Sequence, residues 1–160
     1  MPFTERFQTF VCEGDTITCE VAGFEVTAWI VRDDCPDAPD ERQDGFWPSL
    51  YKDAPGFIGP GNNFRERFAQ AQARAEAVME AWRGDEWFYC GIVLSVAFEG
   101  IELESHATSL WGIEANYPDS DNAYLTDAAN ELLPEALDAG RTILARLIAS
   151  AVALGDGASP

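Results

Sequence analysis

The sequence predicts an α+β fold: an antiparallel β-sheet of about four to six strands with two helices packed on one face. Three observations support this class. Apolar residues alternate with polar ones through residues 16–32, residues 86–114 have the pattern of a meander of strands, and two stretches repeat apolar residues at helical spacing. The helical stretches cover about residues 63–83 and 122–153. A chain of 160 residues has the size of one domain, so we expect residues 1–160 to form a single globular domain.

The first alternating stretch predicts a β-hairpin over residues 16–32. Ile17, Cys19 and Val21 fall on one face and their polar neighbours on the other, as in a half-buried strand. Ala22-Gly23 is a suitable turn, after which the alternation resumes. The preceding segment, "FQTFVC", fits either another strand or a short helix.

Residues 33–61 predict a long loop, because five prolines and four glycines interrupt any regular element. Loops of this length are usually functional or mobile. The second part of the loop contains Trp47 and Tyr51. These aromatic side chains either pin the loop to the domain or form a partner-binding surface, where Trp and Tyr are favoured. The first part is acidic and contains Asp33, Asp34, Asp37, Asp40, Glu41 and Asp44.

The helix over about residues 63–83 has recognisable end signals. Asn63 and Glu66 have the spacing of a capping box, and Gly84 is suited to the end of a helix. Its arginines are too few for a nucleic-acid patch, and we expect them to pair with carboxylates of the same chain. These arginines are Arg65, Arg67 and Arg74.

Residues 86–96, "EWFYCGIVLSV", predict a strand that is apolar on both faces and therefore central in the sheet. After a turn at Glu99-Gly100, Ile101 and Leu103 alternate with Glu102 and Glu104, and a further strand through Ser109 to Glu114 completes an antiparallel meander.

The last helix keeps its apolar phase from Tyr124 through Pro134, so we expect one long helix that is kinked at Pro134 or split just before it. The segment "ANYPDSDN" before it is a joint between strand and helix, in which Ser120, Asp121 or Asn122 caps the helix.

The charge of the chain is unusually negative. The chain has 28 acidic and ten basic residues, which gives a net charge of −18. Residues 1–62 carry −8 (twelve acidic, four basic), residues 63–84 carry +1 (three and four), and residues 85–160 carry −11 (thirteen and two). Such a surface repels nucleic acid and anionic lipid and attracts basic protein surfaces. Solubility alone is the other explanation.

The acidic residues of the last helix form a pattern of their own. Asp127, Glu131, Glu135 and Asp138 follow one another at spacings of four, four and three residues, which places them in a narrow stripe opposite the apolar one. Like charges at these spacings cost an isolated helix about 0.2–0.5 kcal/mol per pair. The stripe either is a solvated face or imitates a phosphate backbone for a basic partner. The acids that would extend it are Asp119, Asp121, Glu102, Glu104 and the six of the loop.

Catalytic and metal-binding patterns are not evident. The chain has one histidine, His106, and no nucleophile-turn or nucleotide-binding motif, so we expect no enzyme, no catalytic residue and no cofactor. Four cysteines without a CxxC pair predict free, mostly buried thiols and no metal site. The amino terminus, "MPFTERFQTF", is unlike a signal peptide and no stretch is typical of a membrane span, so we expect a cytoplasmic protein. The cysteines are Cys12, Cys19, Cys35 and Cys90.

Three segments carry a resemblance to known sequences: "WFYCGIVLSV", "SLWGIEANY" and "YLTDAANELLPEAL". They resemble small, acidic, mostly uncharacterised proteins encoded by phages, prophages and plasmids, over about residues 62–150. The resemblance implies a mobile-element setting, in which acidic inhibitors of host defence or of nucleic-acid enzymes are common. It implies no reaction, cofactor or binding residue.

These observations together predict a non-enzymatic binding protein or inhibitor. Its carboxylates would occupy the basic groove of a nucleic-acid-binding or host-defence protein, without binding nucleic acid or membrane directly. An alternative is a structural or assembly module, such as a homodimer, that uses Trp47 and Tyr51 as an apolar contact. A small-molecule enzyme ranks third, and it would need a deep pocket lined by His106 and perturbed carboxylates.

Overall fold

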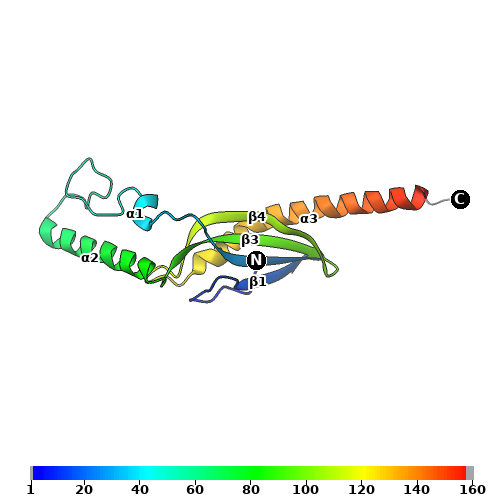
Figure 1. The fold of residues 1–160 in the computed structure, drawn as a ribbon, viewed down its shortest axis with the longest axis horizontal. Coiled ribbons are helices and arrows are strands. Elements are labelled where there is room, and N and C mark those ends of the chain that lie inside the picture. The colour runs from blue at the N-terminus through cyan, green and yellow to red at the C-terminus, as the bar shows by residue number, and fades with distance from the viewer. Residues whose placement is uncertain (1, 158–160) are drawn as a thin grey trace. The chain divides into compact units, whose positions relative to one another are not determined.

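The computed structural model describes residues 2–157 and confirms the predicted α+β class (Figure 1). By contacts along the chain it divides into two compact units. The first unit consists of the chain up to Asp33, Tyr89–Asn116 and the chain from Ser120 on, and the second consists of Asp34–Phe88 and Tyr117–Asp119. The described elements are, in order, β1 (Thr16–Val21), β2 (Phe24–Arg32), α1 (Pro39–Arg42), α2 (Phe64–Arg83), β3 (Phe88–Phe98), β4 (Ile101–Ala115) and α3 (Ala123–Gly157).

The sheet has four strands in the order β1-β2-β3-β4 and is antiparallel. The predicted hairpin is confirmed, with Val21 of β1 paired to Phe24 of β2. Ala22 and Gly23 between them have φ values of 52° and 83°. Two successive left-handed residues are what a two-residue turn between right-twisted strands requires.

The prediction that the apolar strand is central is also confirmed, since β3 lies between β2 and β4. In β3, Ile92 and its neighbour Val93 are both buried although they point to opposite faces. Their partners in β2 are Ile30 and Trp29.

The segment 7–12 is neither the strand nor the short helix that the sequence suggested. It is irregular, because its backbone groups bond to side chains of α3 and of the joint before α3 rather than to another strand.

Helix α3 packs on one face of the sheet, where it contacts β2 and β4. Its buried side chains are Leu125, Thr126, Ala128, Ala129, Leu133, Ala136 and Leu137. The helix approaches the sheet most closely at Gly140, where a Cβ atom would lie 2.9 Å from Cγ2 of Val96 and 3.2 Å from the ring of Phe24. A residue without a side chain is therefore required at this crossing.

Pro134 lies inside α3, on its exposed side, and does not end the helix. The expectation of a split just before Pro134 is wrong. Leu133 precedes the proline and Ala136 follows it, and both are buried. Tertiary packing on both sides of the proline thus compensates for the hydrogen bond that proline removes. None of the helices within residues 2–157 combines the length and apolarity needed to cross a membrane.

The second unit contains α1 and α2. The prediction that residues 33–61 hold no regular element is wrong for α1, a helix of four residues. Pro39 stands at its start, where a missing N–H does no harm, and Glu41 accepts a hydrogen bond from the Ala38 N–H at 3.4 Å. The buried Trp87 side chain contacts α2 in this unit. Its indole N–H donates a hydrogen bond to the Val78 carbonyl at 2.9 Å.

Two expectations about α2 are also corrected. Asn63 precedes the helix but has a φ of 60° and makes no capping bond with its side chain, so the predicted capping box is absent. Arg67 pairs with backbone carbonyls rather than with carboxylates, namely those of Ile58, Gly59 and Asn62 at 3.0–3.4 Å. Gly84 ends the helix as predicted.

The close approach at Gly140 predicts a large difference between two matched substitutions. Gly140→Val should lower the free energy of unfolding by about 1–3 kcal/mol, because the new methyl groups overpack the crossing. Gly155→Val changes helix propensity equally, but a Cβ at position 155 meets nothing within 4 Å. Urea unfolding should therefore show little change for Gly155→Val, and equal losses for the two variants would contradict this packing.

Candidate functional site

The four acidic residues of α3 lie on the side of the helix that faces away from the sheet. Asp127, Glu131, Glu135 and Asp138 are all exposed, whereas the residues at the opposite helical phase are buried. Eleven residues separate the first from the last, which at about 1.5 Å per residue gives a stripe about 17 Å long. We call these four residues the acidic stripe.

The acidic stripe is barely neutralised by the chain itself. Asp138 forms an ion pair with Arg141, with 3.2 Å between Oδ1 and Nη1, and both side chains are more than half exposed. Asp127, Glu131 and Glu135 have no ion-pair partner among the described residues. An exposed pair such as Asp138–Arg141 contributes little, so the stripe keeps its negative potential.

The joint before α3 uses its acids locally. Asp121 accepts a hydrogen bond from the Ala123 N–H at 3.0 Å, and the Asn122 carbonyl accepts one from the Leu125 N–H at 3.0 Å. The predicted joint with capping residues is thereby confirmed. Asp119 is exposed and belongs to the second unit, and its backbone is in the left-handed region with a φ of 66°.

The acids of the loop form a separate group, because all but Asp33 belong to the second unit. Asp40 accepts a bond from the Trp47 indole N–H at 3.3 Å, and Glu41 caps α1. Asp33 is half-buried in the first unit. The remaining loop acids are exposed, namely Asp34, Asp37 and Asp44. The four residues of the stripe therefore lie together on α3. Asp40 and Glu41 instead make hydrogen bonds within the loop.

The two aromatic residues of the loop differ in their surroundings. Trp47 is half-buried, and its ring packs edge-on against Phe46 with centroids 5.2 Å apart. Tyr51 is 80% exposed and adjoins Leu50, which is 48% exposed. These two residues line a cavity of about 380 Å³ together with Pro48, Ser49 and Phe68. Tyr51 therefore offers an apolar contact, whereas Trp47 is mainly structural.

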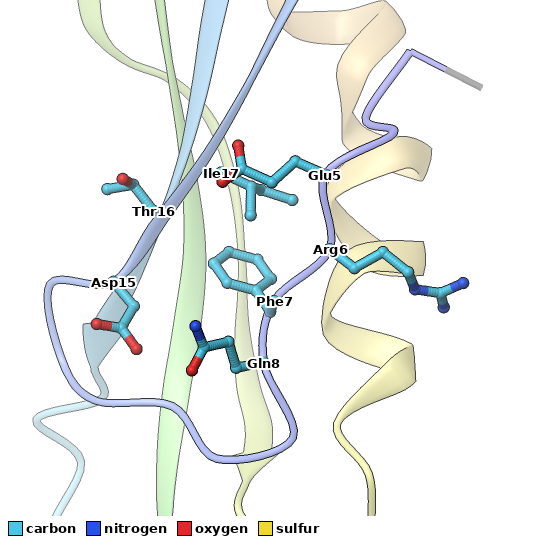
Figure 2. Close-up of a pocket in the computed structure, with 7 residues that line it drawn as sticks. All are labelled: Glu5, Arg6, Phe7, Gln8, Asp15, Thr16 and Ile17. Atoms are coloured by element: carbon cyan, nitrogen blue, oxygen red, sulfur yellow. The ribbon is translucent and has the colours of Figure 1, made fainter.

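The sequence did not reveal that the N-terminal segment, residues 3–11, is hydrogen-bonded to α3, with the Phe3 N–H donating to Asn130 and the Phe7 N–H to Thr126. Phe3, Phe7 and Val11 of this segment are buried. In Figure 2, Phe7 points toward Ile17 of β1, while the neighbouring Arg6 points the opposite way. A small polar cavity of about 220 Å³ remains between the segment and β1. The segment therefore completes the core on the α3 side of the sheet.

Asparagine side chains hold this segment by its backbone. The side-chain amide of Asn116 binds Val11 at both ends, accepting from its N–H and donating to its carbonyl, each at 2.8 Å. Asn122 is fully buried and donates to the Thr9 carbonyl at 3.0 Å and to Asn116 Oδ1 at 2.9 Å. Its Oδ1 accepts from the Asn116 N–H at 2.9 Å. Thr126 Oγ1 accepts a hydrogen bond from the Phe7 N–H at 3.0 Å. The joint before α3 therefore also holds the N-terminal segment in place. We call Asn116 and Asn122 the asparagine clamp.

His106 and the carboxylates near it lie on β4. His106 is exposed, and its Nε2 is 2.8 Å from Ser109 Oγ. His106 lines neither the cavity beside the N-terminal segment nor the cavity at Tyr51. Glu102 is exposed, and Glu104 accepts from the His106 N–H at 3.4 Å. Burial raises the pKa of the Glu114 carboxyl.

None of the four cysteines forms a disulfide bond. Cys19 and Cys90 are buried, but Cys12 and Cys35 are exposed, so the expectation of mostly buried thiols holds for only half of them. Burial raises the pKa of Cys19 to about 11, and burial together with the nearby Asp33 carboxylate raises the pKa of Cys90 to about 12. Both buried thiols stay protonated at neutral pH and are poor nucleophiles.

Comparison with known proteins adds no further constraint. No protein-family model matches the chain, and neither a curated protein nor a solved structure is significantly similar to it.

The asparagine clamp predicts a large effect at Asn122. Its φ of 62° suits glycine, so Asn122→Gly removes the side chain without straining the backbone. Because three buried hydrogen bonds are lost, the free energy of unfolding should fall by about 2–4 kcal/mol. Hydrogen exchange of the Val11 amide should accelerate as well. Asn62→Gly, at an exposed position, is the control, and an unchanged Val11 exchange rate in Asn122→Gly would refute the clamp.

Proposed function

We propose that this protein is a non-enzymatic, cytoplasmic inhibitor that binds a basic protein with its acidic stripe. The partner is a nucleic-acid-binding or host-defence protein, and the stripe occupies the groove in which that partner holds nucleic acid. The observation that carries this proposal is a row of four exposed carboxylates, three of which have no ion pair among the described residues.

The charge spacing of the stripe supports mimicry of a nucleic-acid strand. Four charges over about 17 Å correspond to about one charge per 6 Å. One strand of DNA presents a phosphate about every 3.4 Å along the axis, so the stripe reaches about three-fifths of that linear density. It lies on a helix whose opposite face is buried, so the charges are held in a fixed row. A preorganised row loses little conformational entropy on binding.

The stripe also lowers the stability of the helix that carries it. Asp127–Glu131 and Glu131–Glu135 are like-charge pairs at a spacing of four residues, and Glu135–Asp138 is one at three. Each such pair destabilises an isolated helix by about 0.2–0.5 kcal/mol. Solubility requires negative charge but not this arrangement, whereas a charge-reading partner requires it.

This proposal predicts opposite effects of one double substitution on stability and on binding. Glu131→Gln with Glu135→Gln removes all three like-charge pairs, so the free energy of unfolding should rise by about 0.5–1 kcal/mol at low salt. Binding to the basic partner should weaken at least tenfold, since close charge pairs across an interface are lost. Glu20→Gln with Glu25→Gln is the matched control for binding, because it removes equal charge from exposed positions of the hairpin.

The partner assay is a pull-down from a host lysate at low salt, followed by competition with duplex DNA. The proposal requires that nucleic-acid-binding proteins are retained, are released by DNA and by moderate salt, and are lost with the stripe variant but not with the hairpin variant. Recovery of no nucleic-acid-binding protein, or equal loss with both variants, would refute it.

A second candidate function, self-association through the loop, is favoured by the exposure of Tyr51 and Leu50 beside their apolar cavity. If it operates, light scattering should show a dimer that persists in 1 M salt, because apolar contacts are not screened. Tyr51→Ser with Leu50→Ser should then yield the monomer, whereas Leu147→Ser with Leu154→Ser, at exposed positions near the end of α3, should not. A monomer at all salt concentrations would exclude this function.

A further inference from the structure

The face of the sheet opposite to α3 carries two exposed tryptophans. Alternation in β2 places Val26, Ala28 and Ile30 on the buried side toward α3, and Trp29 and Val31 on the other side. Trp29 is 41% exposed, and Trp111 of β4 is 43% exposed. Such an open face normally carries polar side chains. These two indoles therefore need an explanation beyond core packing.

Both indole rings are fixed by the protein itself. The Trp29 N–H donates to Ser95 Oγ at 3.2 Å, and the Trp111 N–H donates to Ser109 Oγ at 3.0 Å. Trp111 lies over Gly91 of β3, where a Cβ atom would be only 2.4 Å from the ring. Because their N–H groups are already bonded, the rings offer a ligand their π faces rather than a hydrogen-bond donor.

A groove of about 320 Å³ runs beside Trp29 on this face. Its walls combine apolar and acidic groups, since Val31 and Val93 line it together with Glu13 and Glu102. Glu13 lies 3.9 Å from Arg32 in a loose, exposed ion pair. Glu102 is exposed and has no ion pair among the described residues. The groove thus offers an aromatic face, an aliphatic floor and carboxylates.

We propose that this groove binds an arginine side chain of a protein partner. A guanidinium stacks on an indole face and is desolvated more readily than an ammonium. The methylene groups of arginine match the aliphatic floor of Val31 and Val93. The carboxylate of Glu102 then accepts charge-assisted hydrogen bonds from the guanidinium. The net charge of −18 disfavours anionic ligands.

This groove is a surface separate from the acidic stripe. The stripe lies on the side of α3 that faces away from the sheet, and the groove lies on the sheet face that α3 does not cover. The inference therefore does not rest on the proposed function, and the two are tested by different variants.

The test is a titration of the isotope-labelled protein with a short glycine-serine peptide that contains two arginines, followed by the NMR signals of the indole N–H groups. The Trp29 signal should shift and saturate with the arginine peptide. The same peptide with citrulline, which is isosteric but neutral, should produce no shift, and the lysine peptide should bind about 2- to 5-fold more weakly.

Two variants locate the binding. Glu102→Gln should weaken the arginine peptide about 2- to 5-fold, whereas Glu25→Gln, an equal charge change on the same sheet face outside the groove, should leave it unchanged within error. Trp29→Leu keeps an apolar side chain but removes the π face, and should weaken binding about 5- to 10-fold, read from the backbone amide signals of Val31 and Val93, which line the groove.

Several results would overturn the inference: equal binding of the citrulline peptide, equal losses in Glu102→Gln and Glu25→Gln, or wild-type affinity in a folded Trp29→Leu. If Trp29→Leu does not fold, the citrulline peptide and the two glutamate variants still test whether the groove binds arginine. The stripe variant Glu131→Gln with Glu135→Gln should bind the arginine peptide like the wild type. A loss there would mean that the peptide reads the stripe instead of the groove.

Discussion

The packing of α3 against the sheet is the interaction on which the rest of this structure depends. At Gly140 the helix backbone lies against Val96 and Phe24 with no room for a side chain. Alanines at positions 129 and 136 allow a similarly close approach along the same face. Because one face of the helix is committed to the sheet, its opposite face must be exposed. The direction of the acidic stripe follows from this crossing.

The same packing explains how a helix with repulsive charges is tolerated. An isolated helix with this charge row and an internal proline would be weak. In the protein, tertiary burial rather than local propensity supplies most of the stability of a helix. The buried side chains on either side of Pro134 are therefore what permits an unpaired acidic surface on the outside.

The joint between β4 and α3 shows that one segment can have two structural roles. Asp121 caps the helix, while Asn116 and Asn122 turn inward and hold the backbone of the N-terminal segment. A buried polar network in which every group is satisfied specifies one arrangement of the chain and tolerates little change. The N-terminal segment thereby gains a defined path without belonging to a strand.

The sequence by itself determined the elements whose signals are local. The hairpin, the central strand β3, the long helices and the exposure of Asp127, Glu131, Glu135 and Asp138 all follow from periodicities of two or 3.6 residues. Only the tertiary structure decided which distant groups meet. Asn116 bonds to Val11 across 105 residues, and Arg67 bonds to loop carbonyls instead of carboxylates. Trp29 was predicted to lie in a strand, but its groove depends on the register with β3 and on the side that α3 covers. Periodicity specifies which face a residue is on, but not what lies against that face.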